Sequence, residues 1–111
     1  MIYIASYLHR SLIFIFLFVS CVKQDNTNEL YQIFSDARQY ELDTNPISAT
    51  YAGNHKLNDR MPSVSNEQMD KNLNFLKSII LRLEMIQLNT LSKKDKINHK
   101  IFYRIVNSKI K

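Results

Sequence analysis

Apolar residues recur at three- and four-residue steps in three stretches of the chain, and this spacing predicts amphipathic helices. The first stripe contains Leu30, Ile33, Phe34, Ala37 and Tyr40. Asn26 or Thr27 precedes it and offers a side-chain oxygen that caps free backbone amides. We expect this helix to end at Asn45, because a residue before proline is pushed out of the helical region.

A shorter helix is expected to start at Pro46, with Asn45 as its cap and Gly53 as a left-handed stop. Its inner face would consist of Ile47, Thr50 and Tyr51. Residues 54–64 are polar and contain a proline, so they predict a surface loop.

The clearest periodic signal follows a capping box that pairs Ser65 with Gln68. Its apolar stripe consists of Met69, Leu73, Leu76, Ile79, Ile80, Leu83 and Ile86. The pattern breaks at Asn89 and Thr90, so this helix is expected to run to about Leu88.

The last helix is predicted behind a second capping box at residues 92–95. Its inner stripe is expected to contain Ile97, Ile101 and Ile105, with Phe102 and Val106 beside them. The stripe is still in phase at Ile110. We therefore expect these helices to associate with something else or to be a piece of a larger polypeptide.

Composition supports an all-α fold, a short antiparallel helical bundle within a single domain. The 111 residues include one glycine and one cysteine. So few glycines leave little room for tight hairpins or glycine-rich phosphate loops. A lone cysteine excludes an intrachain disulfide and any multi-cysteine metal site.

Residues 12–19 are uninterrupted apolar residues preceded by His9 and Arg10. A spanning helix needs about 20 apolar residues, so this run suits the core of a signal peptide. The first ten residues are themselves mostly apolar, and the alternative is an uncleaved amino-terminal anchor that tolerates Arg10. Insertion of an arginine at the centre of a spanning helix costs about 2.5–3.5 kcal/mol of free energy.

The leader ends in Phe18-Val19-Ser20-Cys21, which resembles the lipobox of bacterial lipoproteins. That resemblance implies cleavage after residue 20 and lipid attachment at Cys21, whose sulfur forms the thioether. Residues 1–20 would be the signal peptide, 21–28 a tether and 29–111 the helical segment, anchored at the cell envelope and facing the periplasm or exterior. The alternative is a small buried or free thiol.

Charge is unevenly distributed along the chain. Residues 24–70 hold eight acids and three bases, a net charge of −5, whereas residues 92–111 hold seven bases and one acid, a net charge of +6. The basic positions of the last helix are explained by solvation or pairing with the acidic end. A membrane surface is the alternative, and nucleic acid is disfavoured as a partner of an exported protein.

Several motifs together resemble the start of bacterial proteins of the domain of unknown function 885 family. They are residues 45–50 (Asn-Pro-Ile-Ser-Ala-Thr) leading to Gly53, residues 58–60 (Asn-Asp-Arg), and residues 91–98 (Leu-Ser-Lys-Lys-Asp-Lys-Ile-Asn). The resemblance implies an exported protein, often a lipoprotein, similar to helical zinc metallopeptidases. Family members are longer, and their His-Glu metal motif belongs to a later part without counterpart in this sequence.

No catalytic, cofactor-binding or metal-binding residue is therefore predicted. His55 and His99 are far apart in sequence, unlike a helical zinc pair at a four-residue step, and we expect them to be solvated or hydrogen-bonded. We expect Glu67, Glu84 and Asp95 at helix starts or outer faces. The first functional hypothesis is a non-catalytic, lipid-anchored amino-terminal portion of a peptidase-like protein, whose partner would be the rest of the family domain. The alternatives are a complete small lipoprotein that acts as an interaction module, and a subunit that supplies a substrate-binding wall.

Overall fold

The computed structural model describes residues 25–111 and confirms an all-α fold for them. The long helices are α2 (Asn26–Thr44), α4 (Asn66–Met85) and α5 (Lys93–Ile110). The shorter elements are α3 (Pro46–Tyr51) and a 3₁₀ turn, η2 (Leu88–Thr90). No helix of this part of the chain is both long and apolar enough to cross a membrane. The predicted signal peptide and Cys21 lie outside the described residues.

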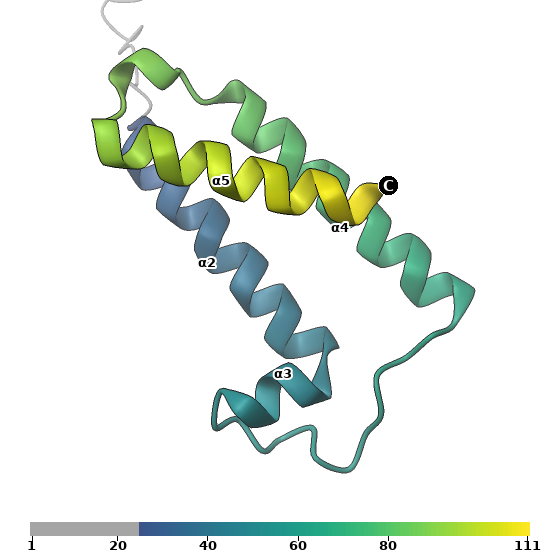
Figure 1. Cartoon of the computed structure of the whole chain (residues 1–111). Coiled ribbons are helices and arrows are strands. Elements are labelled where there is room, and N and C mark those ends of the chain that lie inside the picture. Colours follow the sequence, from purple (N-terminus) through teal and green to yellow (C-terminus); the bar gives the residue numbers. More distant parts are fainter. Residues whose placement is uncertain (1–24) are drawn as a thin grey trace, which may run out of the picture.

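Consecutive long helices run in opposite directions (Figure 1). α4 returns alongside α2, and α5 returns along α4, so that the start of α5 lies next to the start of α2. The loop between α3 and α4, residues 52–65, closes the opposite end of the molecule. The described residues thus form a short antiparallel bundle, as predicted.

The helix ends follow the predicted capping residues with one exception. Asn45, Ser65 and Ser92 each accept hydrogen bonds from backbone amides of the helix that follows. The cap of α2 is Asp25, whose carboxylate accepts from the amides of Thr27 and Asn28. The prediction of Asn26 or Thr27 was therefore wrong, and residues 26–28, assigned to the tether, form the first turn of α2.

Asn26 lies in the interior because its amide group has partners on the connection between α4 and α5. Its Nδ2 donates to Oγ1 of Thr90 at 2.9 Å, and its Oδ1 accepts from the backbone amide of Gln87 at 3.4 Å. A short polar side chain thereby fixes the start of α2 to η2 and its flanks.

The core joins α2, α4, the connection between α4 and α5, and the second half of α5. It consists of Leu30, Ile33, Ile79, Leu83, Ile86, Leu91 and Val106. Most of the apolar stripe predicted for α2 and α4 packs on this core, but Tyr40 and Leu73 are not part of it and Met69 is 59% exposed. α4 ends at Met85, three residues before the expected end, and buries its capping residue Ile86.

The inner face of α3 differs from the prediction. Pro46 and Ala49 are buried, whereas Ile47 and Thr50 are exposed and Tyr51 is 90% exposed. The hydroxyl of Ser48 donates to a carboxylate oxygen of Glu41 at 3.0 Å, and this bond turns the small residues of α3 toward α2. Gly53 adopts a φ of 81°, the left-handed stop expected after α3.

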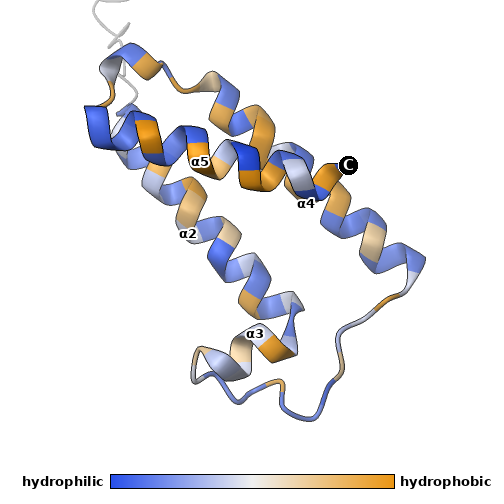
Figure 2. Ribbon diagram, viewed as in Figure 1, coloured by the Kyte–Doolittle hydropathy of each residue, from blue (hydrophilic) through white to orange (hydrophobic). Residues whose placement is uncertain are grey.

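α5 is rotated relative to the prediction. Its buried residues are Asp95, His99 and Val106, while Ile97, Ile101 and Ile105 are about half exposed. Orange and blue bands therefore alternate along α5 in Figure 2. The reason is that Asp95 and His99 both find hydrogen-bond partners inside the bundle, described below. Phe102 and Val106 pack on the core as expected.

Candidate functional site

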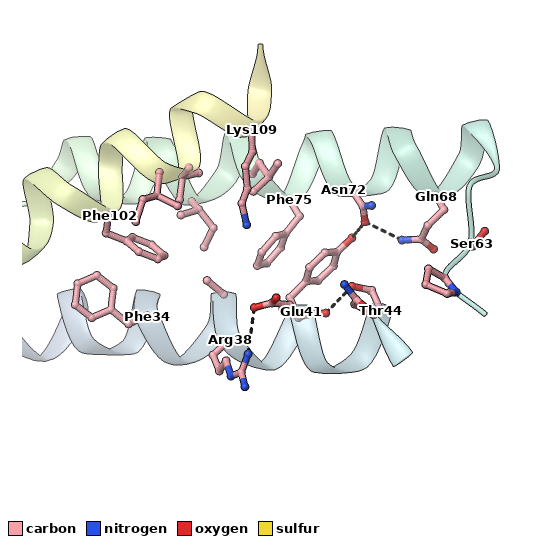
Figure 3. Close-up of a pocket in the computed structure, with 18 residues that line it drawn as sticks. Phe34, Arg38, Glu41, Thr44, Ser63, Gln68, Asn72, Phe75, Phe102 and Lys109 are labelled. Atoms are coloured by element: carbon pink, nitrogen blue, oxygen red, sulfur yellow. Dashed lines mark hydrogen bonds and ion pairs between the residues drawn. The ribbon is translucent and has the colours of Figure 1, made fainter. Parts of the chain in front are cut away.

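A cleft of about 400 Å³ lies between α2, α4 and the second half of α5. Phenylalanines from all three helices line it: Phe34 from α2, Phe75 from α4 and Phe102 from α5 (Figure 3). Leu76 and Ile79 of α4 add further apolar surface. Clefts of this size and composition accommodate apolar groups of a ligand or a packing helix.

One end of the cleft is held by a stacked aromatic pair. The rings of Tyr40 and Phe75 lie with centroids 3.8 Å apart and planes 9° from parallel. The Tyr40 hydroxyl donates to Oδ1 of Asn72 at 2.7 Å, and Nε2 of Gln68 donates to the same oxygen at 2.9 Å. The bond from Tyr40 ties the end of α2 to α4, and the bond from Gln68 holds the Asn72 side chain within α4, so this wall is preformed.

The other end is an edge-to-face contact between α2 and α5. The ring centroids of Phe34 and Phe102 are 4.7 Å apart, with planes at 68°. Between the two aromatic pairs α2 presents Ala37, whose methyl group reaches only a short way from the backbone. Small side chains between large ones leave space, and this arrangement accounts for the cleft.

Three charged side chains lie at the rim of the cleft: Arg38, Glu41 and Lys109. Nη1 of Arg38 lies 3.3 Å from Oε2 of Glu41, whose other carboxylate oxygen accepts from Ser48. Figure 3 shows the Lys109 side chain directed from α5 into the space between the helices. Within residues 25–111 no acid lies within ion-pair distance of Lys109. The cleft therefore offers an apolar surface beside one available cation.

The structure keeps the two histidines of the helical segment apart. His55 is exposed in the loop after α3, with Nδ1 3.3 Å from the side-chain amide nitrogen of Asn58. His99 is buried in α5, with Nε2 2.8 Å from the carbonyl oxygen of Leu83. Both are engaged in hydrogen bonds, in line with the prediction. No cluster of three or more His, Cys, Asp or Glu side chains suited to a metal occurs in residues 25–111.

Asp95 lies in the first turn of α5, at a helix start as expected, and it is buried there. Its carboxylate accepts from Oγ of Ser92 at 2.6 Å and from the hydroxyl of Tyr31 at 2.9 Å. The bond from Ser92, and after it the bond from Tyr31, lowers the pKa of Asp95 below its ordinary value. The same contact raises the pKa of Tyr31. Glu67 and Glu84, in contrast, are exposed, and they contact Lys71 and Tyr103.

Two acidic residues of α2 pair with α4. Arg82 reaches two of them, with Nε 2.9 Å from Oε1 of Glu29 and Nη1 2.6 Å from Oδ2 of Asp36. The hydrogen bond from Arg82 is the largest cause of the lowered pKa of Asp36. No ion pair joins α5 to α2 in the described residues, so the expected pairing of the two chain ends is absent there.

No family model, curated protein or solved structure matches this chain. The candidate site is thus defined by its own geometry. The sequence indicated which faces are apolar but not the cleft. The aromatic residues that frame it lie on three helices, and the rotation of α5 against the other two depends on the contacts of Asp95 and His99.

Proposed function

We propose that this chain is an exported, lipid-anchored helical segment that forms one wall of a larger helical protein and is not catalytic alone. The observation that carries the proposal is the aromatic cleft between α2, α4 and α5, which presents apolar surface to a further packing element. Glu41 is the one acid at the cleft, and it is occupied by Arg38 and Ser48. Both carboxylate oxygens of Glu41 are therefore engaged, and binding is the better-supported role.

The resemblance to the domain of unknown function 885 family suggests what the larger protein is. In this proposal the remainder of a peptidase-like domain supplies the metal motif, and its next helix occupies the cleft. That helix would present apolar side chains to Phe75 and Phe102 and an acidic side chain to Lys109. In support, two residues of the quoted motifs have defined local roles, since Asn45 caps α3 and Gly53 makes the left-handed turn.

A complete small lipoprotein that acts as a helical interaction module is the second candidate. It is favoured by the polar side chains buried within the described residues, Asn26, Asp95 and His99, because each has its hydrogen-bond partner within this segment. The codons downstream separate the two candidates. In-phase amphipathic helices followed by a His-Glu motif would support the wall of a larger protein, and an unrelated neighbouring gene would support the module.

The lipid anchor is tested at Cys21, the only cysteine of the chain. Cys21→Ser should release the protein from the membrane fraction and abolish labelling by a fatty-acid analogue. Ser20→Ala is the matched control, because alanine keeps a small residue before the cysteine and labelling should persist. Retention of Cys21→Ser at the membrane, with an unlabelled parent, would instead indicate an uncleaved anchor.

A further inference from the structure

The outward face of α5 combines isoleucines with basic residues. Ile97 and Ile101 are 52% and 53% exposed and lie four residues apart, whereas Ile105, 47% exposed, lines the cleft. Successive steps of four residues place side chains along one side of a helix. The basic side chains that share or flank this side are exposed: Lys93, Lys94, Lys96, Lys100 and Arg104.

No acidic residue of α5 faces outward. The one acid of this helix is Asp95, which is buried and hydrogen-bonded to Ser92 and Tyr31. No ion pair involves the five basic residues within the described part of the chain. The outward face of α5 is therefore cationic and partly apolar, and its charge is available to a partner.

The chain leading to the proposed anchor starts beside this helix. The bond between Tyr31 and Asp95 joins the first turns of α2 and α5, and Asn26 bonds to Thr90 just before α5. Cys21 precedes Asp25 by four residues, which span at most about 14 Å when extended. A lipid on Cys21 would hold the start of α5 close to the bilayer surface.

We propose that the outward face of α5, defined by Ile97, Ile101, Lys93, Lys100 and Arg104, binds the surface of an anionic lipid bilayer. The proposal rests on the proposed lipid anchor for the nearness of this face to the membrane, whereas the attraction depends on α5 alone. The isoleucines would enter the boundary between headgroups and acyl chains. The lysine stems would lie along them, with the amines at the phosphates.

Charge complementarity favours this partner. Each lysine or arginine near an anionic membrane surface strengthens binding about fivefold, and stable membrane attachment combines a lipid with a second signal such as a basic patch. Nucleic acid would use the cations but gives no reason for the two half-exposed isoleucines, Ile97 and Ile101, between them. The face thus fits headgroup phosphates above an apolar layer.

A tryptophan introduced on the face tests the contact directly, because the chain contains no tryptophan of its own. Full-length Ile101→Trp is mixed with phosphatidylglycerol vesicles that carry brominated acyl chains. Its fluorescence should shift to shorter wavelength and be quenched, and both effects should be weak with phosphatidylcholine. Leu81→Trp is the matched control, since Leu81 is exposed on α4 away from the core and should stay unquenched.

A charge variant gives a second, independent measurement. Replacing Lys93, Lys100 and Arg104 with glutamine should weaken binding of the Ile101→Trp protein to anionic vesicles on the order of a hundredfold. The same change of net charge at Lys56, Arg60 and Lys77 should leave binding within a few-fold. Circular dichroism of each variant establishes that the helices are retained.

The inference is wrong if the fluorescence of the Ile101→Trp protein stays unquenched in anionic vesicles while the protein sediments with them, or if the two charge variants bind equally. It is also wrong if single-stranded RNA displaces the vesicles at equal phosphate concentration. None of these results tests the proposed lipid on Cys21. That proposal is wrong if the parent protein carries no fatty-acid label.

Discussion

Nε2 of His99 donates a hydrogen bond of 2.8 Å to the backbone carbonyl oxygen of Leu83. Leu83 lies in the last turn of α4, where carbonyl groups have no intrahelical partner one turn further on. The backbone amide of Ile86 reaches the same oxygen at 3.2 Å. A side chain of α5 thus completes the end of α4, and the register between the two helices is fixed by a polar contact inside an apolar core.

His99→Leu should destabilise the protein, because leucine keeps most of the side-chain volume but cannot donate to the Leu83 carbonyl. We expect the free energy of unfolding to fall by about 1–2 kcal/mol in urea denaturation. His99→Gln, which retains a donor, should lose less. Lys100→Leu is the exposed neighbour and serves as control. An unchanged unfolding midpoint in His99→Leu would mean that Ile86 alone satisfies this carbonyl.

Arg82 should couple energetically to Asp36. A double-mutant cycle with Arg82→Met and Asp36→Asn should give a coupling energy of about 0.5–1 kcal/mol, because the pair is only partly shielded from water. The matched cycle on Arg38 and Glu41, whose side chains are 53% and 44% exposed, should give a smaller value. Salt should reduce both couplings. Equal couplings would mean that the bridge between α2 and α4 is no stronger than a surface pair.

The hydrogen-bonded carboxylates of Asp95 and Asp36 predict how the stability of the folded protein changes at acidic pH. The pKa values of Asp95 and Asp36 are lowered in the folded protein below their ordinary value of 3.8. A lowered folded-state pKa adds stability above the unfolded-state pKa, and this stability is lost as the pH falls through the folded-state value. We therefore expect the melting temperature to drop below about pH 4.

Asp95→Asn should make the melting temperature fall less steeply below about pH 4, because the substituted side chain cannot take up a proton. Asp70→Asn is the matched control, since Asp70 is an exposed carboxylate with no hydrogen-bond partner within residues 25–111. Thermal unfolding followed by circular dichroism from pH 2 to pH 7 measures both variants. If the melting temperature falls equally steeply with pH in Asp95→Asn and Asp70→Asn, Asp95 does not contribute to the acid-dependent loss of stability.

Local signals predicted most of the fold. Asn45, Ser65 and Ser92 cap helices because a cap needs only its own side chain and the next few amides. The stripes of α2 and α4 were also predicted correctly for most of their length, with Met69 as the exposed exception.

Rotation of a helix with two competing faces could not be predicted in this way. In α5 the isoleucines at 97, 101 and 105 form the more regular apolar stripe, yet Asp95 and His99 face the core. Their partners are Tyr31 and Leu83, which are 64 and 16 residues away in sequence. Periodicity within one helix carries no information on such partners. The cleft depends on the same rotation, so it was beyond prediction as well.

The cleft should bind apolar groups, and Ala37 is the position at which it can be filled. Ala37→Leu adds apolar volume between Phe34 and Tyr40 and should lower the fluorescence of an apolar dye bound to the protein. Cavity filling should also raise the free energy of unfolding by about 0.5–2 kcal/mol. Ser35→Leu adds a comparable side chain to an exposed position of α2 and should not lower dye binding. If Ala37→Leu binds the dye as well as the parent does, the apolar binding surface lies outside the cleft. The proposal that a further helix packs there would then lose its main support.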